Sequence, residues 1–317
     1  WGSFAVVGSI NSEISERTWD QQRLSALSPW QMAWGKLLGA SIYPWFGGII
    51  CAAVVLASGM VASDNLPRVI ILLLASILGL LALHCWLMAS RLHTMDANAA
   101  SNNSSLIKRL FGLYIFLQVV PGALALLFAF SDKRSDALTS WWGLPLGFSS
   151  LCLLMATLGL ALGLLALWRT MSTQLMVRTT PWAWALGCTA AGLIVAGFVH
   201  DPHARLLWPA IVAGLAITAT YFALFTDKNN AIVWRAVAFH ARQANWRRML
   251  QSLPLWPVSW LLALLFTLLY SLLTGFLPET DGSANGPALA VHKIASQLVW
   301  MCLLHALRDA GIFLFFA

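Results

Sequence analysis

Charged side chains are scarce in this sequence: they make up 10% of its 317 residues, whereas hydrophobic residues make up 59%. Soluble domains carry about 25% charged residues, so this composition excludes an ordinary water-soluble protein. The net charge of +7 would indicate a nucleic-acid partner on a soluble chain. In a membrane protein, basic loops that set the orientation explain it. We therefore expect membrane lipids around the chain and no nucleic acid.

Motifs for catalysis are missing as well. The sequence contains no G-x-x-x-x-G-K-[ST] phosphate loop, no H-E-x-x-H and no G-x-S-x-G. His200 and His203 flank an Asp-Pro turn, which offers too few ligands for a closed zinc site. We expect no enzyme activity, metal or cofactor in this chain. The cysteines lie in apolar stretches without C-x-x-C spacing, and we expect small buried hydrophobes at Cys51, Cys85, Cys152, Cys188 and Cys302.

Long apolar stretches make up most of the sequence. A helix needs roughly 20 apolar residues to cross a hydrocarbon core about 30 Å thick, and backbone polar groups in lipid must be paired within the helix. We expect an all-α, polytopic transmembrane helical bundle with about 8–10 spans in a single transmembrane domain, 1–317. The predicted spans are 37–61, 68–90, 108–130, 143–168, 182–200, 207–226, 255–277 and 288–307, with the tail of a truncated first span at 1–10 and a further one starting near 310.

Lys and Arg are distributed unevenly between the loops. If segment 11–36 is cytoplasmic, the inside loops hold 14 of the 19 basic residues, as the positive-inside rule requires. The chain then divides into the cytoplasmic segment 11–36, a helical bundle over 37–226, a cytoplasmic interfacial helix over 227–253 and C-terminal spans over 254–317. The last apolar run stops at Ala317, so we expect these C-terminal spans to be truncated.

Segment 11–36 is a polar island between two spans. Ser12 is a candidate N-cap, and the predicted helix ends near Leu27 because the residue before Pro29 avoids helical geometry. We expect the chain to re-enter the membrane interface at Trp30, Met32, Trp34 and Leu37. The alternative is an ordinary interhelical loop that contains an amphipathic piece.

The pattern of this island resembles the first cytoplasmic segment of ABC-2-type permeases. It reads Glu13…Glu16-Arg17-Thr18-Trp19-Asp20…Leu24…Leu27-Ser28-Pro29…Gly35-Lys36-Leu37-Leu38-Gly39. The resemblance implies a coupling helix that docks on a separate ATP-binding subunit, a second permease subunit and a bacterial inner (plasma) membrane. The residues that would contact the ATPase are Glu13, Glu16, Arg17, Thr18, Trp19, Asp20, Arg23 and Leu24. The family core has six spans, so this chain would belong to an expanded branch.

A second cytoplasmic stretch, 227–253, is rich in Arg and Trp. Arg235 and Arg242 lie on one helical face, whereas Val237, Ala238 and Ala241 lie on the opposite one. This pattern is typical of an interfacial helix with Arg on lipid head groups. The Arg residues concerned are Arg235, Arg242, Arg247 and Arg248. A positive-inside anchor and a second ATPase contact both remain open for this stretch.

None of the eight predicted spans contains Asp or Glu, which argues against an ion-coupled carrier. We expect His84 to be a hydrogen-bonded packing residue, and Arg308 and Asp309 to be solvated at a span end or to form a local ion pair there. The favoured function is the permease subunit of an ATP-driven exporter, with an amphipathic or lipid-like cargo or a hydrophobic natural product. The alternatives are a secondary transporter or channel without an ATPase, and a non-transporting membrane scaffold.

Overall fold

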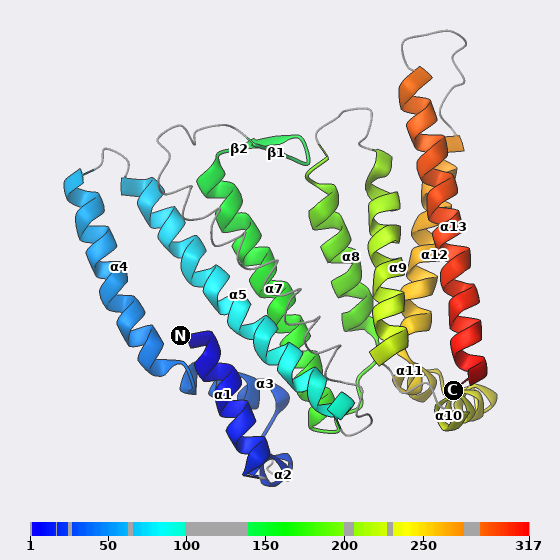
Figure 1. Cartoon of the computed structure of the whole chain (residues 1–317), viewed down its shortest axis with the longest axis horizontal. Coiled ribbons are helices and arrows are strands. Elements are labelled where there is room, and N and C mark those ends of the chain that lie inside the picture. The colour runs from blue at the N-terminus through cyan, green and yellow to red at the C-terminus, as the bar shows by residue number, and fades with distance from the viewer. Residues whose placement is uncertain are drawn as a thin grey trace. The chain divides into compact units, whose positions relative to one another are not determined.

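The chain folds into a helical bundle with almost no sheet (Figure 1). The structure is a computed structural model, and it describes residues 2–16, 18–24, 27–62, 66–98, 139–199, 206–226, 231–275 and 286–316. Within these ranges, six helices are long and apolar enough to cross a membrane. This architecture confirms the all-α polytopic fold and makes the protein an integral membrane protein.

The helices belong to two compact units, each with its own core. Unit 1 consists of Trp1–Thr139 and Pro145–Val177, and unit 2 of Ser140–Leu144 and Arg178–Ala317. Unit 1 holds α1 (Gly2–Ser15), α2 (Thr18–Arg23), α3 (Pro29–Gly39), α4 (Ile42–Ala62), α5 (Leu66–Asn98) and α7 (Phe148–Gln174). Unit 2 holds α8 (Trp182–Ala196), α9 (Trp208–Thr226), α10 (Ala231–Arg242), α11 (Trp246–Ser252), α12 (Leu255–Gly275) and α13 (Gly286–Phe316). A short hairpin of β1 (Thr139–Trp141) and β2 (Leu144–Leu146) lies where the chain passes between them.

Most predicted spans overlap these helices, and two differences at their boundaries change the fold. The span predicted at 143–168 corresponds to α7, which begins only after β2 and ends at Gln174. The span expected from residue 37 begins at Ile42, because α3 ends at Gly39 and the chain turns at 40–41. Pro44 fits the first turn of α4. Backbone N–H groups in the first turn have no partner within the helix, so the N–H that Pro lacks costs no hydrogen bond there. The predicted span 182–200 is the shorter apolar helix α8, and the predicted span 108–130 lies outside the described residues.

The second wrong boundary lies at the end of the chain. The predicted break between 307 and 310 is absent, since α13 runs without interruption and its candidate span is Val291–Phe315. The charges of Arg308 and Asp309 do not end the helix, because the two side chains neutralise each other through bonds of 2.7 and 2.8 Å. Asp309 is therefore a carboxylate inside a candidate span. This overturns the sequence-based expectation that the spans hold no acidic residue.

Small residues bring α5 and α7 together in unit 1. A Cβ added at Gly163 of α7 would lie 3.1 Å from Cys85 Cβ and 3.3 Å from the Ala82 carbonyl oxygen of α5. A Cβ at Gly159, one turn earlier, would lie 4.0 Å from Ala82 Cβ, which is an ordinary van der Waals contact. Gly159 and Gly163 form a G-x-x-x-G pattern, which lets two helix backbones approach closely in a membrane. The sequence contained this signal, and our sequence analysis missed it.

Hydrogen bonds between side chains join α9, α12 and α13 in unit 2. Thr220 of α9 donates to Ser259 of α12 at 3.2 Å. Tyr270 of α12 is hydrogen-bonded to His292 of α13 at 2.9 Å, and both side chains are buried. A close approach of Gly192 to Val212 joins α8 to α9. Unit 2 thus combines one small-residue contact with polar pairs between its longer helices.

Candidate functional site

The candidate site is the bend formed by the end of α1, α2 and α3, in unit 1. The sequence predicted one helix from Ser12 to Leu27, and this was wrong in two respects. Ser12 lies inside α1, where its hydroxyl donates to the Ser9 carbonyl at 2.9 Å, so it caps nothing. The separate helix α2 has only six residues and ends at Arg23. The polar segment therefore continues the first helix and then turns.

Pro29 starts a helix as well as following one. Ser28 caps α3: its hydroxyl accepts from Gln31 N at 3.3 Å, and its own N–H donates to Gln31 Oε1 at 2.9 Å. This reciprocal capping box leaves Pro29 at the first helical position, which its fixed φ favours. Met32 and Leu37 of α3 are buried. Trp30 and Trp34 are partly exposed, which is compatible with the expected interfacial re-entry.

Trp19 attaches the short helix α2 to the bundle. Its side chain is only 5% exposed and belongs to a cluster with residues of four other helices. The cluster includes Val6 and Ile10 of α1, Met32 and Leu37 of α3, Met88 and Leu92 of α5, and Leu167 and Met171 of α7. A buried Trp removes a large apolar area from water. The burial of Trp19 therefore attaches α2 to the apolar core that α1, α3, α5 and α7 share.

Lys36 adds an electrostatic link at the same place. Its ammonium group forms an ion pair with Glu13 at the end of α1 and lies 4.9 Å from the centre of the Trp19 ring. The Lys36 side chain is 9% exposed, so water screens these interactions only in part. Asn11 of α1 also accepts from Arg91 Nε of α5 at 2.6 Å. These contacts fix the bend to the ends of the neighbouring helices.

The eight residues predicted to contact an ATPase occupy different environments. Glu13 and Trp19 point into unit 1, and the Thr18 hydroxyl donates to the Glu13 carbonyl at 3.2 Å. Glu16 is exposed, and Leu24 is exposed by 89% just after α2. Arg17 lies outside the described residues, as do the side chains of Asp20 and Arg23 within α2. A partner could therefore touch Glu16 and Leu24 directly but could reach Trp19 only through the bend.

The stretch predicted to be an interfacial helix contains α10, followed by α11. Arg235, Arg242, Arg247 and Arg248 are all exposed. On the face predicted to lie opposite Arg235 and Arg242, Ala238 and Ala241 are exposed and Val237 is half-buried. Trp234 of α10 contacts α12, since its ring lies 5.9 Å from that of Trp256.

The exposed faces of α10 and α11 also carry large apolar side chains. Ile232 and Phe239 of α10 are exposed, as are Trp246 and Leu250 of α11. Apolar rings and aliphatic chains beside the exposed Arg residues form a surface suited to a lipid interface, where the apolar groups enter the acyl region and the guanidinium groups meet anionic head groups.

Asp309 forms a second polar site, in unit 2. Its carboxylate accepts from the Tyr221 hydroxyl of α9 at 2.8 Å and from Arg308 at 2.7 and 2.8 Å. The predicted ion pair between Arg308 and Asp309 is thus confirmed. Among the described residues of the six candidate spans, Asp309 is the only Asp or Glu. An ionisable side chain inside a membrane span is a candidate for proton or ion handling.

Comparison with protein-family models, with curated proteins and with solved structures gives no match to this chain.

Proposed function

We propose that this chain is the membrane-spanning permease subunit of an exporter driven by a separate ATP-hydrolysing subunit, in a bacterial inner (plasma) membrane. The observation that carries the proposal is the burial of Trp19 in a cluster shared by α1, α3, α5 and α7. In this proposal the short polar helix acts as a lever, because Trp19 attaches α2 to the buried cluster that these four helices share. The resemblance of residues 13–39 to the coupling segment of ABC-2-type permeases supports the same assignment.

The docking surface in this proposal consists of exposed side chains at the bend, chiefly Glu16 and Leu24. Trp19 transmits the movement without touching the partner. A second permease subunit, identical or homologous, completes the translocation path. The exposed Arg side chains of α10 and α11 hold the other unit at the lipid interface, and they are a second surface for the ATPase if the bend is not the docking site.

The experiment is purification of the full-length protein from its native host in mild detergent, with mass spectrometry of the proteins that remain bound. We expect an ATPase with a Walker A loop to co-purify. Leu24→Asp places a charge on the docking surface and is expected to lower its recovery at least tenfold. Leu250→Asp makes the same change on exposed α11 and serves as the matched control, with unchanged recovery.

Trp19→Phe tests the lever separately from docking. This variant keeps an aromatic ring in the cluster, so we expect the ATPase to stay bound while transport-coupled ATP hydrolysis falls. If Leu250→Asp released the ATPase and Leu24→Asp did not, the docking surface would lie on α11. Absence of any bound ATPase, with the protein still monodisperse, would overturn the proposal.

A secondary transporter is the second candidate, and Asp309 is the observation that favours it. Its hydrogen bond to Tyr221 joins α9 to α13 within the bundle of unit 2, so a change in its protonation would alter a contact between two spans. This candidate predicts uptake into liposomes driven by an ion gradient without ATP, and loss of that uptake in Asp309→Asn. ATP-independent uptake that persists in Asp309→Asn would contradict it.

A further inference from the structure

A short hairpin lies against the C-terminal end of α8 in unit 2. Its tip, Ser140–Leu144, joins β1 to β2 through the two residues Trp142 and Gly143. Both have positive φ angles, 52° and 79°, which is the geometry of a type I′ turn. Asn and Gly are the usual residues in such a turn, and a bulky side chain is strained there. Trp142 is nevertheless 43% exposed, so its contacts within the protein account for only part of this choice.

Gly197, at the end of α8, allows the hairpin to approach the helix. A Cβ at Gly197 would lie 2.3 Å from Trp141 Nε1 and 2.6 Å from Trp142 Nε1, which is closer than real Cβ contacts. The Trp142 backbone N–H donates to the Gly197 carbonyl at 2.9 Å, and Trp141 Nε1 donates to the Ile194 carbonyl at 3.2 Å. A glycine at this position therefore lets both Trp residues bond to the helix.

These two bonds complete the pairing of the backbone carbonyls at the end of α8. A helix leaves its last four carbonyl groups without partners inside the helix. The N–H groups of residues 197–199 bond to three carbonyls of the last turn, at 3.1 Å each, and the hairpin supplies the donors for Ile194 and Gly197. Every carbonyl from residue 193 to residue 197 thus has a donor within the protein. Water would satisfy such groups at a solvated helix end, whereas in lipid the protein itself must pair them.

The length of α8 indicates that this end lies inside the membrane. Its 15 residues rise about 22 Å, at 1.5 Å per residue, which is about 8 Å less than a hydrocarbon core of about 30 Å. Arg178 is exposed, and Trp182, the first residue of α8, is 50% exposed. Arg and Trp are typical of a membrane–water interface, so the helix begins at one. Its other end, with the hairpin, then lies below the head groups of the opposite leaflet.

The composition around the hairpin fits the same depth. No charged residue occurs between Asp136 and Arg169, or between Arg178 and Asp201. The tip and the end of α8 expose large apolar side chains, namely Trp142, Leu144, Val195 and Phe198. Trp is enriched where an apolar ring meets lipid and its N–H meets polar groups. An uncharged surface of this kind is suited to acyl chains.

We propose that the tip Ser140–Leu144 is inserted into the membrane leaflet at the C-terminal end of α8, with Trp142 and Leu144 against the upper part of the lipid acyl chains. The hairpin and α8 together then complete one crossing of the hydrocarbon core, which α8 alone is too short to make. The partner of this surface is membrane lipid, recognised through its acyl chains and not through a charged head group. The inference does not depend on the proposed transport function.

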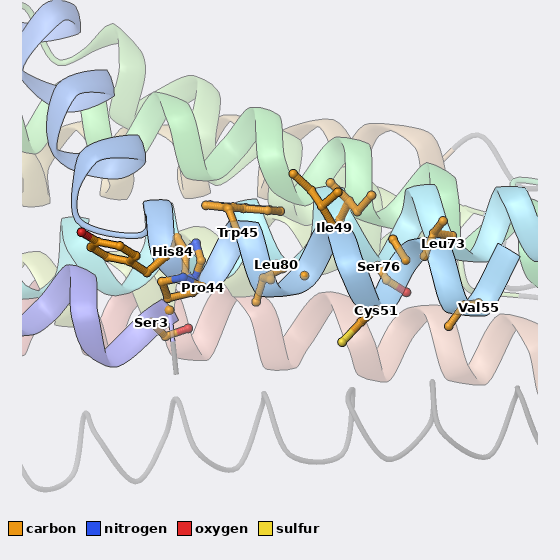
Figure 2. A pocket seen from close by; sticks show the side chains of 15 residues that line it. Ser3, Pro44, Trp45, Ile49, Cys51, Val55, Leu73, Ser76, Leu80 and His84 are labelled. Carbon is orange, nitrogen blue, oxygen red and sulfur yellow. The ribbon is translucent and has the colours of Figure 1, made fainter. Parts of the chain in front are cut away.

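An open groove of about 600 Å³ beside α4, in unit 1, provides a comparison surface (Figure 2). Its lining is mostly apolar, and none of the candidate span of α4 is buried. The ring nitrogens of His84 and the indole nitrogen of Trp45 are buried and have no hydrogen-bond partner among the described residues, so they offer nothing to a molecule in the groove. His84 is thus a packing residue, as predicted, but not a hydrogen-bonded one. Cys51, exposed at the middle of the candidate span, is a reference position for an ordinary lipid-facing side chain.

The experiment replaces Leu144 by the fluorescent amino acid Anap in the full-length protein, which is placed in phosphatidylcholine vesicles. Nitroxides on acyl carbon 5 or carbon 12 quench fluorophores at those depths, and iodide quenches fluorophores in water. We expect the carbon-5 nitroxide to quench Anap at Leu144 at least twofold more than the carbon-12 nitroxide does. The same probe at Cys51 is the deep reference, and at Leu24, which is 89% exposed at the polar bend, it is the aqueous reference.

Two results would overturn the proposal. Iodide quenching at Leu144 as strong as at Leu24 would place the hairpin in water. Quenching by neither nitroxides nor iodide would place it against another protein surface.

Two glycines of α8 provide a matched pair of variants. Gly197→Ala adds the Cβ that clashes with Trp141 and Trp142, whereas a Cβ at Gly187 has no atom within 4 Å. With Anap at Leu144, we expect Gly197→Ala to raise iodide quenching at least twofold and Gly187→Ala to leave it unchanged. Equal quenching in the two variants would overturn the positioning of the hairpin by α8.

Trp142→Asn keeps the test valid even if Gly197→Ala does not fold. Asn adopts the left-handed conformation more readily than Trp, so the turn is retained and the aromatic side chain is lost. We expect iodide quenching of Anap at Leu144 to rise at least twofold, while the melting temperature of the protein does not fall. An unchanged quenching pattern would overturn the insertion of Trp142 into the membrane.

Discussion

The two units of this protein hold their helices together with a different balance of contacts. In unit 1, Gly163 of α7 lets its backbone approach Ala82 of α5, and one buried hydrogen bond, from Gln174 Nε2 to the Leu92 carbonyl at 2.9 Å, joins the same two helices. In unit 2, hydroxyl, imidazole and carboxylate groups bond across α9, α12 and α13. Lipid tails are as apolar as Leu, so helix association in a membrane depends on both mechanisms. Each unit therefore combines close packing with interhelical polar bonds, and in unit 2 the polar pairs join its long spans α9, α12 and α13.

The difference also predicts where each unit can change state. Close-packed backbones have little freedom to slide, so we expect unit 1 to move as a rigid body. Polar pairs can exchange partners, and protonation changes them, so unit 2 contains the groups that could respond to ions. Buried nitrogens without a hydrogen-bond partner among the described residues occur in both units, at Trp19, Trp45 and His84 in unit 1 and at Trp184, Trp234 and His240 in unit 2.

The largest effect is expected for Gly163→Leu, which disrupts the packing of α7 against α5 in unit 1. Its Cβ alone would lie 3.1 Å from Cys85 Cβ and 3.3 Å from the Ala82 carbonyl oxygen, so the rest of the Leu side chain must push α5 away. Overpacking of this kind costs about 1–3 kcal/mol. We expect a lower melting temperature in detergent and faster alkylation of Cys85, which is buried in the native protein.

Gly187→Leu is the control for this variant. Gly187 lies in α8, and a Cβ there has no atom within 4 Å. The same substitution should leave the melting temperature and the Cys85 reactivity at their native values. If Gly163→Leu matched this control, the α5–α7 contact would not be the packing centre of unit 1.

A smaller effect is expected for Tyr270→Phe, which removes a hydroxyl from the buried contact between α12 and α13. That hydroxyl bonds to His292 Nδ1 at 2.9 Å, and its distance to the His292 carbonyl is 3.3 Å. Interhelical hydrogen bonds in membranes average about 0.6 kcal/mol and reach about 1.7. We expect a loss of stability in the upper part of this range, measured by thermal unfolding. Tyr43→Phe, at an exposed position of α4, should have no effect.

Sequence reasoning predicted the helices better than the contacts between them. Apolar runs of about 20 residues predict the spans well, because in lipid the backbone polar groups must be paired within a helix or a closed barrel. The break at 40–41 and the continuity of α13 depended on local pairing, such as the ion pair of Arg308 with Asp309, which hydropathy does not register. As a result, sequence reasoning placed the carboxylate of Asp309 at a span end. It then counted the lack of carboxylates in the spans as an argument against an ion-coupled carrier.

The candidate site was predicted in composition but not in orientation. The motif around Trp19 singled out this segment as the candidate site, yet a six-residue helix offers too little periodicity to show which side is buried. Trp19 shares its buried cluster with Met88 and Leu167, which are far away in the sequence, so its burial could not be predicted from the motif.

The smallest effect concerns Thr220 and Ser259, and it is the most direct test of the comparison between the units. The Thr220 hydroxyl is 2.8 Å from the Ala216 carbonyl of its own helix and 3.2 Å from Ser259 Oγ of α12. Because the bond within the helix competes for the same proton, the interhelical part is weak. A double-mutant cycle of Thr220→Val and Ser259→Ala is expected to give a coupling energy of about 0.6 kcal/mol.

Thr218→Val is the control for this cycle. Thr218 is exposed and bonds to its own helix at 2.7 Å, so it should show no coupling to Ser259→Ala. A coupling energy of zero for Thr220 would mean that close packing also dominates unit 2, and the distinction between the units would then rest on Tyr270 and Asp309 alone.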